Sequence, residues 1–424
     1  MLLPRDAKTV LFDQNARVVR LLRLLGTAGE EARLVGGAVR NALLGAAVHE
    51  FDVATTALPE DVMARAAADG LKTVPTGIAH GTVTVIVSGE AFEVTSLRED
   101  IETDGRRAVV RFGRDFKIDA LRRDFTINAL SVGLDGRIHD YTGGLKDISA
   151  RCVRFIGDPK QRIREDYLRI LRFFRFSAAY ARGALDPGGL SACLSEREGL
   201  ACLSKERIGQ EMRKLIMAEH AAEVLGEAPV AGLLEPLCGG RLDVPRFARL
   251  SLLETECGVE RELVRRIAGL VCDSSEDMVS TVRDALKLSN AERDRMLAIL
   301  RAGGYAHEFV ERLQHVHMAG SSSLIEAVYR VGASALVDAL LLRAAEKSGF
   351  GEVAALGHLI EGVSTLRPPS NPFSGGMFVS LGIKPGAAMG AARRRAEAAW
   401  IAAGFPEDAQ AIRTLAQLAV RSAK

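Results

Sequence analysis

The sequence predicts an α+β fold in which an N-terminal domain with a small mixed sheet is followed by an entirely helical remainder. Between about residues 32 and 156, short runs with strand periodicity alternate with helical runs. After about Asp158 the strand patterns stop, and helical periodicity continues to the C-terminus. The length of 424 residues is enough for about two to four domains.

Each expected element has a local signal. An amphipathic helix is expected over residues 14–26, and a second helix opens at Pro59 and ends with Gly70 at its C-cap. The expected strands are runs of apolar and β-branched residues at Arg33–Val35, Phe51–Ala54, Thr82–Val87, Phe92–Leu97 and Arg137–Tyr141. The later helices are expected to break at clusters of Gly, Pro and Ser, namely 183–190, 227–240, 303–304, 319–323, 368–376 and 382–386.

Composition excludes several classes of protein. The chain is 48% hydrophobic and 26% charged, as expected of a globular protein without a membrane span. Its six cysteines are scattered without a Cys-x-x-Cys pair, which indicates reduced thiols of a cytoplasmic protein and neither a zinc site nor a disulfide framework. The net charge is only +2, but Arg151–Arg182 holds nine basic and three acidic residues. That local excess of positive charge suits phosphate groups.

The segment from Leu34 to Asp52 has the pattern of a phosphate and metal site. A short apolar run ends in Gly36 and Gly37, and a helical stretch carrying Arg40 follows. Two glycines allow backbone N–H groups to approach a phosphate at the start of a helix. Glu50 and Asp52 are then expected on one face of a strand, where two carboxylates repel each other unless a cation lies between them. Taken alone, this acidic pair also fits a solvated strand edge.

Further candidate residues lie later in the chain. Glu93 lies on a predicted neighbouring strand and is a possible third acidic metal ligand, or an ordinary polar position paired with an arginine. The polar stretch Arg98–Ile118 reads as a flexible loop with an exposed turn, or alternatively as a surface hairpin. His80 is interpreted as capping a turn, and His315 and His317, two residues apart on a predicted helix, do not favour a common metal.

The motif Arg122-Arg123-Asp124-Phe-Thr-Ile-Asn128-Ala combines two arginines with a carboxylate and an amide. The guanidinium fork can bind phosphate oxygens with two parallel hydrogen bonds. An aspartate can accept a hydrogen bond from a ribose hydroxyl, which would favour ribonucleotides. The alternative is a charged cap before the apolar run that follows.

A row of charged residues recurs every three positions in the predicted helix around Glu165–Arg175: Asp166, Arg169, Arg172 and Arg175. A carboxylate and a guanidinium one turn apart can offer acceptors and donors to the edge of a base. The alternative is a surface helix stabilised by salt bridges between residues three apart.

Together these motifs resemble the class II tRNA nucleotidyltransferases (CCA-adding enzymes) and the related bacterial poly(A) polymerases, within the DNA polymerase β superfamily. The resemblance covers roughly residues 30–220 and rests on Gly-Gly-x-Val-Arg, the acidic-x-acidic strand, RRDFTINA and Glu-Asp-x-x-Arg, in that order. Glu206–Lys214 is similar to the family's last motif, a helix that stabilises the neck. Two departures stand out: Glu50 occupies a position where Asp is commonest, and Asn41 replaces the Asp that follows Arg40.

The resemblance implies a head, neck, body and tail arrangement: a catalytic nucleotidyltransferase head (polymerase β-like) over 1–150, a basic neck over 151–220 that selects the nucleotide, and a helical body and tail over 221–424 that bind tRNA. It implies that Glu50 and Asp52, with Glu93 as a possible third, bind Mg²⁺, with two ions expected. It assigns binding of the triphosphate and ribose, and support of that site, to Gly36, Gly37, Arg40, Arg123, Asp124 and Asn128. It assigns pairing with the base to Asp166 and Arg169, and further contacts with the triphosphate to Arg172 and Arg175.

The reaction implied is addition of the 3′-terminal CCA to tRNA from CTP and ATP with release of pyrophosphate. The partners are then the tRNA 3′ end and acceptor arm, and no protein partner is evident. The Arg98–Ile118 loop, which in the family takes part in the switch from C to A addition, argues against an enzyme that adds only C-C. A poly(A) polymerase shares most of these motifs, and a catalytically decayed RNA-binding protein would explain Glu50 and Asn41. Both alternatives stay open.

Overall fold

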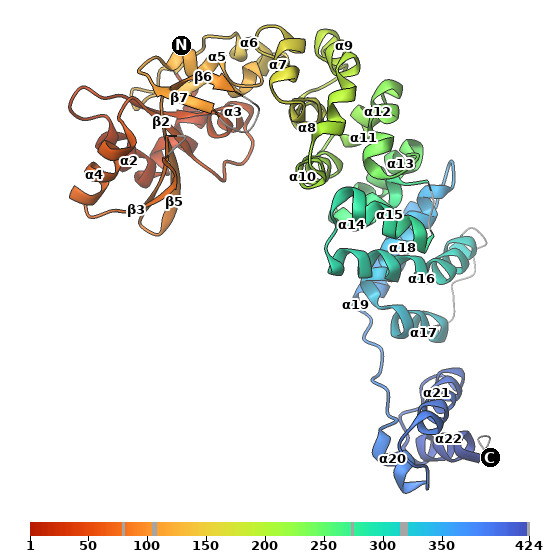
Figure 1. Ribbon diagram of the computed structural model, residues 1–424. Coiled ribbons are helices and arrows are strands. Elements are labelled where there is room, and N and C mark those ends of the chain that lie inside the picture. The colour runs from red at the N-terminus through yellow and green to blue at the C-terminus, as the bar shows by residue number, and fades with distance from the viewer. Residues whose placement is uncertain (79–80, 104–107, 273–274, 314–320, 422–424) are drawn as a thin grey trace. The chain divides into compact units, whose positions relative to one another are not determined.

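The computed structural model describes residues 1–78, 81–103, 108–272, 275–313 and 321–421. They form two compact units, Met1–Leu237 with Ala285–Lys287, and Cys238–Asp284 with Leu288–Lys424 (Figure 1). All strands of the described residues lie in the first unit, and the second is helical, so the α+β class predicted from the sequence is confirmed.

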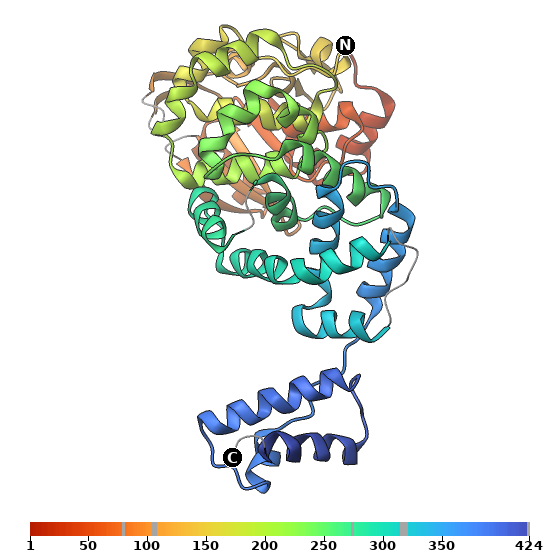
Figure 2. The ribbon, with the colours of Figure 1, turned by 90° about the vertical axis from the view of Figure 1, so that its right-hand side faces the viewer.

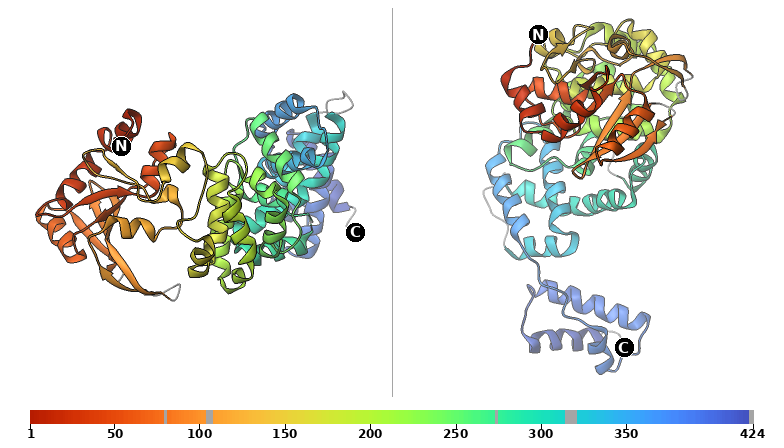
Figure 3. Two further views of the ribbon diagram at one scale, coloured as in Figure 1. Left: turned by 90° about the horizontal axis from the view of Figure 1, so that it is seen from above. Right: turned by 90° about the vertical axis from the view of Figure 1, so that its left-hand side faces the viewer.

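The first unit contains a mixed sheet of seven strands in the order β3-β4-β5-β2-β1-β8-β9. Figure 3 shows these strands, in red to orange, from two further sides. Strand β2 runs parallel to β5 and antiparallel to β1, and it therefore sits in the middle of the sheet. The strands are β1 (Ala32–Val35), β2 (Asp52–Thr55), β3 (Lys72–Gly77), β4 (Thr82–Val87), β5 (Glu90–Ser96), β8 (Ser131–Val132) and β9 (Ile138–His139).

Alternation of apolar residues explains the central strands. Val83, Val85 and Val87 of β4 are fully buried, as are Phe92 and Val94 of β5 to within 1%, while the residues between them are exposed or half-buried. This period of two places one face of the sheet against the helices that cover it. Strand β3 was not predicted, because its polar and exposed residues carry no such alternation and it depends on pairing with β4.

Of the two interpretations of Arg98–Ile118, a loop and a surface hairpin, the structure contains the hairpin. Strands β6 (Arg98–Thr103) and β7 (Ala108–Phe112) pair as a separate two-stranded sheet, and helix α5 (Phe116–Leu121) follows. Val109, Val110 and Phe112 have high strand propensity, and pairing with β6 satisfies their backbone groups.

The first unit also contains the helices that hold the sheet and the motifs. Helices α2 and α4 contact each other as well as strands of the sheet, and the helix predicted at Pro59 ends at Ala68 with Asp69 as C-cap, one residue before Gly70. The helices are α1 (Arg5–Lys8), η1 (Thr9–Asp13), α2 (Ala16–Leu25), α3 (Gly37–Leu44), α4 (Pro59–Ala68), α5 (Phe116–Leu121), η3 (Thr126–Asn128), α6 (Gly144–Ser149), α7 (Pro159–Glu165), α8 (Leu168–Tyr180), α9 (Pro187–Ser195), η4 (Arg197–Cys202), α10 (Lys205–Ile216), α11 (Ala221–Gly226) and α12 (Ala228–Cys238).

Two of the predicted helix breaks are wrong. Helix α12 occupies most of the break predicted at 227–240 despite Pro236, because Val230 and Leu234 are buried. Helix α16 runs through Gly303 and Gly304, and the nearby Ala302 and Ala306 are buried. The helices that follow α12 are α13 (Val244–Glu256), α14 (Leu263–Leu270), α15 (Glu276–Leu286), α16 (Asn290–Leu313), α17 (Ser321–Val331), α18 (Ala333–Glu346), α19 (Val353–Thr365), α20 (Gly375–Ser380), α21 (Ala387–Ala402) and α22 (Ala409–Arg421).

The last helices share a core centred on Trp400. In Figure 2 the two blue helices α21 and α22 lie side by side. Trp400 is 2% exposed, packs edge-on against Phe405 at 4.8 Å between ring centroids, and donates a hydrogen bond from Nε1 to the carbonyl oxygen of Pro406. Trp400 is therefore a core residue of this part of the chain.

A buried ion network holds the helices of the second unit together. Arg265 of α14 pairs with Glu254 of α13 at 2.7 Å and with Asp338 of α18 at 2.9 Å. Arg295 of α16 pairs with the other oxygen of Asp338 at 2.8 Å, and Arg266 pairs with Glu254. Each buried carboxylate thus joins two guanidinium groups, which offsets much of the cost of removing them from water.

Replacing Asp338 by alanine is therefore expected to lower the free energy of unfolding by about 3–5 kcal/mol, because two guanidinium groups lose their shared partner. The exposed pair Arg330–Glu326 offers a control, since Glu326→Ala is expected to cost less than about 1 kcal/mol. Chemical denaturation of both variants measures the difference. Equal losses in the two variants would contradict the structural role of the network.

Candidate active site

One hollow in the first unit collects the residues predicted from the motifs. Its volume is about 600 Å³, and all of the predicted site residues except Glu93 line it. The lining residues are Gly36, Gly37, Arg40, Glu50, Asp52, Arg122, Arg123, Asp124, Asn128, Asp166, Leu168, Arg169, Arg172, Arg175, Phe176 and Arg207. Seven arginines face four carboxylates, so the hollow carries an excess of positive charge that suits a triphosphate.

Gly36 forms the turn between β1 and α3 in a conformation that favours glycine, with φ 66° and ψ −124°. Its N–H donates to the carbonyl oxygen of Leu130 at 3.3 Å and is therefore already engaged within the fold. A Cβ at this position would lie 3.0 Å from Nη1 of Arg123. The missing side chain thus allows Arg123 to approach the turn and the start of α3.

The acidic residues lie at the edge where β2 begins. The strand starts at Asp52 and not at Phe51 as predicted, because β1 ends at Val35 and offers no further pairing partner. Glu50 is exposed and precedes the strand, so it does not share a strand face with Asp52, although both line the hollow. Glu93 of β5 stands opposite Asp52 in the parallel register.

Burial and these neighbours shift the pKa of Asp52. Burial raises the pKa of its carboxyl above the ordinary value, the negative charges of Glu93 and Glu50 raise it further, and Arg123 opposes them. A cation bound here would relieve the same repulsion. Among the described residues, no group of three His, Cys, Asp or Glu side chains is already arranged around a metal position.

Arg40 reaches across the hollow from α3. Its guanidinium donates to Oδ1 of Asn41 at 2.9 Å, to Oη of Tyr180 at 2.7 Å and to Oδ1 of Asn128. Asn41 therefore still orients Arg40, by a neutral hydrogen bond where an aspartate would form an ion pair. The side chain is buried, and desolvation lowers the pKa of Arg40. Its hydrogen-bond partners among the described residues are neutral, so an anionic ligand would supply the missing counter-charge.

Asp119, which the sequence reasoning missed, fixes both arginines of the RRDFTINA motif. Its Oδ1 accepts from Arg122 at 2.9 Å and its Oδ2 accepts from Arg123 at 3.0 Å. Asp119 is buried, which raises its pKa, but the charges of Arg123 and Arg122 outweigh the burial and the net shift is downward. The spacing of three and four residues along α5 and its C-cap was the signal that could have identified it.

Asp124 is fully engaged within the fold. Oδ1 accepts from Nδ2 of Asn128 at 3.1 Å and from the backbone N–H of Phe125, and Oδ2 accepts from Nε of Arg172 at 2.8 Å. Burial favours the neutral acid, but Arg172 and these hydrogen bonds lower the pKa of Asp124 overall. Arg172 thus ties the motif to α8, 48 residues along the chain.

This pairing predicts a pH effect on stability. Because the pKa of Asp124 in the folded state lies below its ordinary value of 3.8, its contribution is present above that pH and is lost as the pH falls through the folded pKa. Asp124→Asn is expected to lower the free energy of unfolding by about 1.5–3 kcal/mol at neutral pH. Urea denaturation at neutral pH and at about pH 3 should show the deficit shrinking in acid. A deficit independent of pH would contradict the assignment.

The charged row on α8 is partly as predicted. Arg169, Arg172 and Arg175 lie on the helix, but Asp166 does not, because α7 ends at Glu165 and Asp166 is extended. Asp166 accepts hydrogen bonds from the backbone N–H of Leu168 at 3.1 Å and from Arg207 at 2.8 Å. This break separates α7 from α8 and places the Asp166 carboxylate at the N-terminus of α8.

Two more residues of the hollow were missed by the sequence reasoning. Arg207 on α10 holds Asp166, and the motif Glu206–Lys214 was interpreted only as a stabilising helix. The ring of Phe176 lies 5.2 Å from the guanidinium carbon of Arg40, 5.1 Å from that of Arg172 and 4.1 Å from that of Arg175. An aromatic face at these distances attracts cations and groups them. A phenylalanine between arginines in α8 was the available signal.

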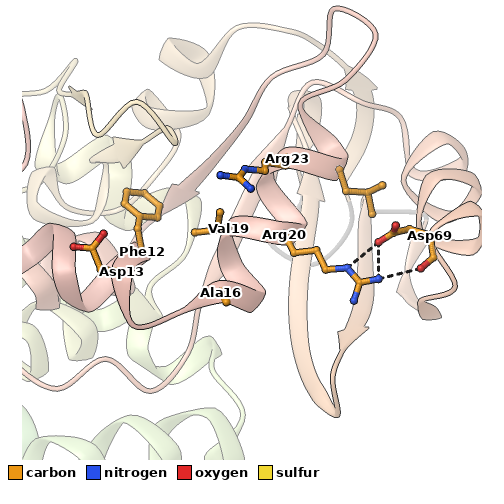
Figure 4. A pocket seen from close by; sticks show the side chains of 8 residues that line it. Phe12, Asp13, Ala16, Val19, Arg20, Arg23 and Asp69 are labelled. Carbon is orange, nitrogen blue, oxygen red and sulfur yellow. Dashed lines mark hydrogen bonds and ion pairs between the residues drawn. The ribbon is translucent and has the colours of Figure 1, made fainter.

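A second hollow, of about 570 Å³, lies at α2 (Figure 4). Its lining includes two arginines and two aspartates, and Arg20 donates to Asp69 at 2.9 Å through Nε. The charges are balanced there, so this hollow lacks the positive excess of the first. His80, His315 and His317 lie outside the described residues.

Two further observations concern the whole described chain. All six cysteines are free thiols, as predicted. Within the described residues, no helix combines the length and the apolar character needed to cross a membrane.

Comparison with known proteins identifies a matching family model and individual relatives. The family model described as "Poly A polymerase head domain" matches residues 32–154. The mitochondrial CCA tRNA nucleotidyltransferase 1 of Danio rerio is 45% identical over 201 residues, 46% of each chain, so the chain spans about half the length of the first curated relatives it matches. The CCA-adding enzyme of Lactobacillus helveticus is 30% identical over 390 residues, which is 89% of this chain and 90% of the relative.

The fold is also similar to a solved structure. The crystal structure of the Bacillus stearothermophilus CCA-adding enzyme in complex with CTP has a TM-score of 0.73 and 28% identity, and the match covers 96% of this chain and 98% of that chain. The sequence likeness to the Lactobacillus helveticus enzyme extends over nine-tenths of both chains. This chain therefore belongs to the family of CCA-adding enzymes.

Proposed function

We propose that this protein is a tRNA nucleotidyltransferase that adds or repairs the 3′-terminal CCA of tRNA, using CTP and ATP and releasing pyrophosphate. The observation that carries the proposal is the composition of the hollow. It brings acidic residues, a set of arginines and the pair Asp166–Arg169 into one place. These groups serve the three tasks of the reaction: activation of a hydroxyl, binding of a triphosphate and choice of a base.

The acidic edge fits Mg²⁺. Glu50 and Asp52 supply carboxylate oxygens to the hollow, and Glu93 stands beside Asp52 as a possible third ligand. Burial and, after it, the negative charge of Glu93 raise the pKa of Asp52, and a cation would neutralise that negative charge. Two Mg²⁺ ions, when bound, would activate the 3′-hydroxyl of the tRNA and stabilise the charge on the leaving pyrophosphate. Glu50 is one methylene longer than Asp and remains an oxygen ligand.

The arginines are proposed to hold the triphosphate. Arg40 is buried without a charged hydrogen-bond partner among the described residues, so a phosphate would complete its surroundings. Arg123 is fixed by Asp119 beside the Gly36 turn, and Arg172 and Arg175 approach from α8. Gly36 and Gly37 keep the start of α3 open for close approach of a phosphate. Asp124, supported by Asn128, is proposed to lie near the ribose.

Asp166 and Arg169 are proposed to select the base. Among the described residues the hydrogen bonds of Arg169 run through Nη1, which leaves Nε–H and Nη2–H for an acceptor on the base. Asp166 offers a carboxylate held by Arg207. Together they present donors and acceptors in a fixed arrangement, as a template strand would.

The three predicted parts of the chain would then divide the work. Residues 1–150 would catalyse, residues 151–220 would select the nucleotide, and residues 221–424 would bind tRNA. The basic segment Arg151–Arg182 supports contact with the phosphates of the acceptor arm, where recognition by shape and backbone is expected. The free thiols support a reducing compartment, and we propose the cytoplasm.

End-sequencing tests this proposal. The protein is incubated with Mg²⁺, CTP, ATP and a tRNA transcript that lacks its last three nucleotides, and a transcript that already ends in CCA serves as control. Addition of C-C-A followed by arrest supports the proposal, and the complete tRNA should stay unextended. A long A-tail would assign the chain to the poly(A) polymerases. Binding of tRNA without any addition would favour a decayed, RNA-binding protein.

A further inference from the structure

Arg162 is a half-buried arginine that contacts the backbone of the RRDFTINA motif. It lies on α7, its side chain is 12% exposed, and it is not among the residues that line the hollow. Its Nη2 donates to two consecutive backbone carbonyl oxygens, that of Arg123 at 2.5 Å and that of Arg122. One guanidinium nitrogen therefore fixes the backbone immediately before Asp124.

The other terminal nitrogen of Arg162 is linked through Glu165 to Arg169, one of the two proposed base-selecting residues. Nη1 donates to Oε2 of Glu165 at 2.5 Å, and the same oxygen accepts from Nη1 of Arg169 at 2.6 Å. Nη1 of Arg169 also donates to the carbonyl oxygen of Arg162 at 2.7 Å. Arg162, Glu165 and Arg169 thus form a closed cluster, which we call the Arg162 cluster.

The cluster is costly as a purely stabilising device. Burial lowers the pKa of Arg162, because removal from water disfavours the guanidinium charge. Its Nε is buried without a hydrogen-bond partner, which costs free energy that a well-packed apolar side chain would not. A costly arrangement next to a binding site is where a functional constraint is expected.

We propose that Arg162 is a positioning residue that couples base selection by Arg169 to the placement of the triphosphate and ribose by Arg123 and Asp124. This inference rests on the proposed function. Through Glu165 it sets the guanidinium of Arg169, and through the two carbonyls it sets the backbone of the RRDFTINA motif. A correct base would then align the phosphates for reaction, and an incorrect base would displace them.

The test compares Arg162→Met and Arg162→Lys with Arg164→Met. Arg164 lies on the same helix but is 62% exposed and pairs with Glu196, so its variant controls for the loss of a positive charge from α7. For each variant, kcat/KM is measured for CTP and for UTP with a tRNA lacking CCA. We expect Arg162→Met to lower the ratio of CTP to UTP about 10- to 100-fold, since displacements of about 1 Å can cost that much.

Arg162→Lys separates positioning from charge. A lysine keeps the charge but lacks the fork that joins two carbonyls to Glu165, so we expect a ratio between those of the wild type and Arg162→Met. Arg164→Met should leave the ratio unchanged. Equal losses for CTP and UTP in Arg162→Met would mean a general structural defect and would overturn the inference.

A second variant covers failure to fold. Glu165→Gln keeps the size of the side chain and weakens both of its arginine contacts, and it is expected to lower the same ratio. An unchanged ratio in a folded Glu165→Gln protein would also overturn the inference. A wild-type protein that adds neither C nor A would overturn the proposed function itself, a result distinct from active variants with unchanged ratios.

Discussion

Replacing Asp52 by alanine is expected to lower the rate of nucleotide addition by about 10²–10³-fold or more, the cost of removing one group that stabilises charge in a transition state. The expectation follows from the position of Asp52 at the start of β2, between Glu50 and Glu93 and inside the hollow. Of the two neighbouring carboxylates only Glu50 would then remain in the hollow, because Glu93 does not line it. Single-turnover addition of the first C measures the effect.

Two controls separate a loss of catalysis from a loss of folding or of RNA binding. Asp69→Ala removes an exposed carboxylate that pairs with Arg20 at the second hollow, and it should leave the rate unchanged. Binding of tRNA to Asp52→Ala, measured by filter retention, is expected to match the wild type, because tRNA is held mainly through phosphates elsewhere. An Asp52→Ala protein with normal turnover would refute the catalytic role of this edge.

Replacing Asp166 by asparagine is expected to lower kcat/KM for CTP about 10²–10³-fold and to raise misaddition of UTP. The variant keeps the shape of the side chain and exchanges one acceptor oxygen for a donor N–H₂. A site built to hydrogen-bond a particular base edge discriminates strongly, since a mismatched group leaves buried polar atoms unpaired. Competition between CTP and UTP in one reaction, read by sequencing the 3′ ends, measures the change.

Glu206→Gln provides the matched control for Asp166→Asn. Glu206 lies on α10 beside Arg207, is 65% exposed and makes only a distant pair with Lys287 at 3.9 Å. Its neutralisation should change neither rate nor base choice. Unchanged competition in Asp166→Asn would indicate that Arg169 or the backbone selects the base alone, and the proposed pairing would then be wrong.

Much of the fold follows from local patterns in the sequence. The alternating valines of Thr82–Val87 predict β4 with its bounds, and Pro59 predicts the start of α4. The three-residue recurrence of Arg169, Arg172 and Arg175 predicts a common helical row. These predictions succeed because the periods of helices and strands are properties of neighbouring residues.

The errors have one cause. Strand β3 was missed, and the hairpin of β6 and β7 was only an alternative to a loop, because strand pairing, and not local pattern, stabilises them. The positions of Glu50 and Asp166 were wrong by a residue or a turn, because a strand begins where its partner β1 ends and a helix breaks where Arg207 holds a carboxylate. In each case the deciding contact comes from another part of the chain.

The sequence by itself determined the class of the fold, the order of the motifs and most of the residues that meet in the hollow, with Arg207 and Phe176 missed. Only the tertiary structure decided how those residues are held: Arg172 on Asp124, Arg207 on Asp166 and Arg162 on the backbone of the RRDFTINA motif. Their partners lie about 40 or more residues apart. Spacing along a chain cannot specify such pairs, because any arginine can pair with any carboxylate or carbonyl until packing brings one of them within hydrogen-bonding distance.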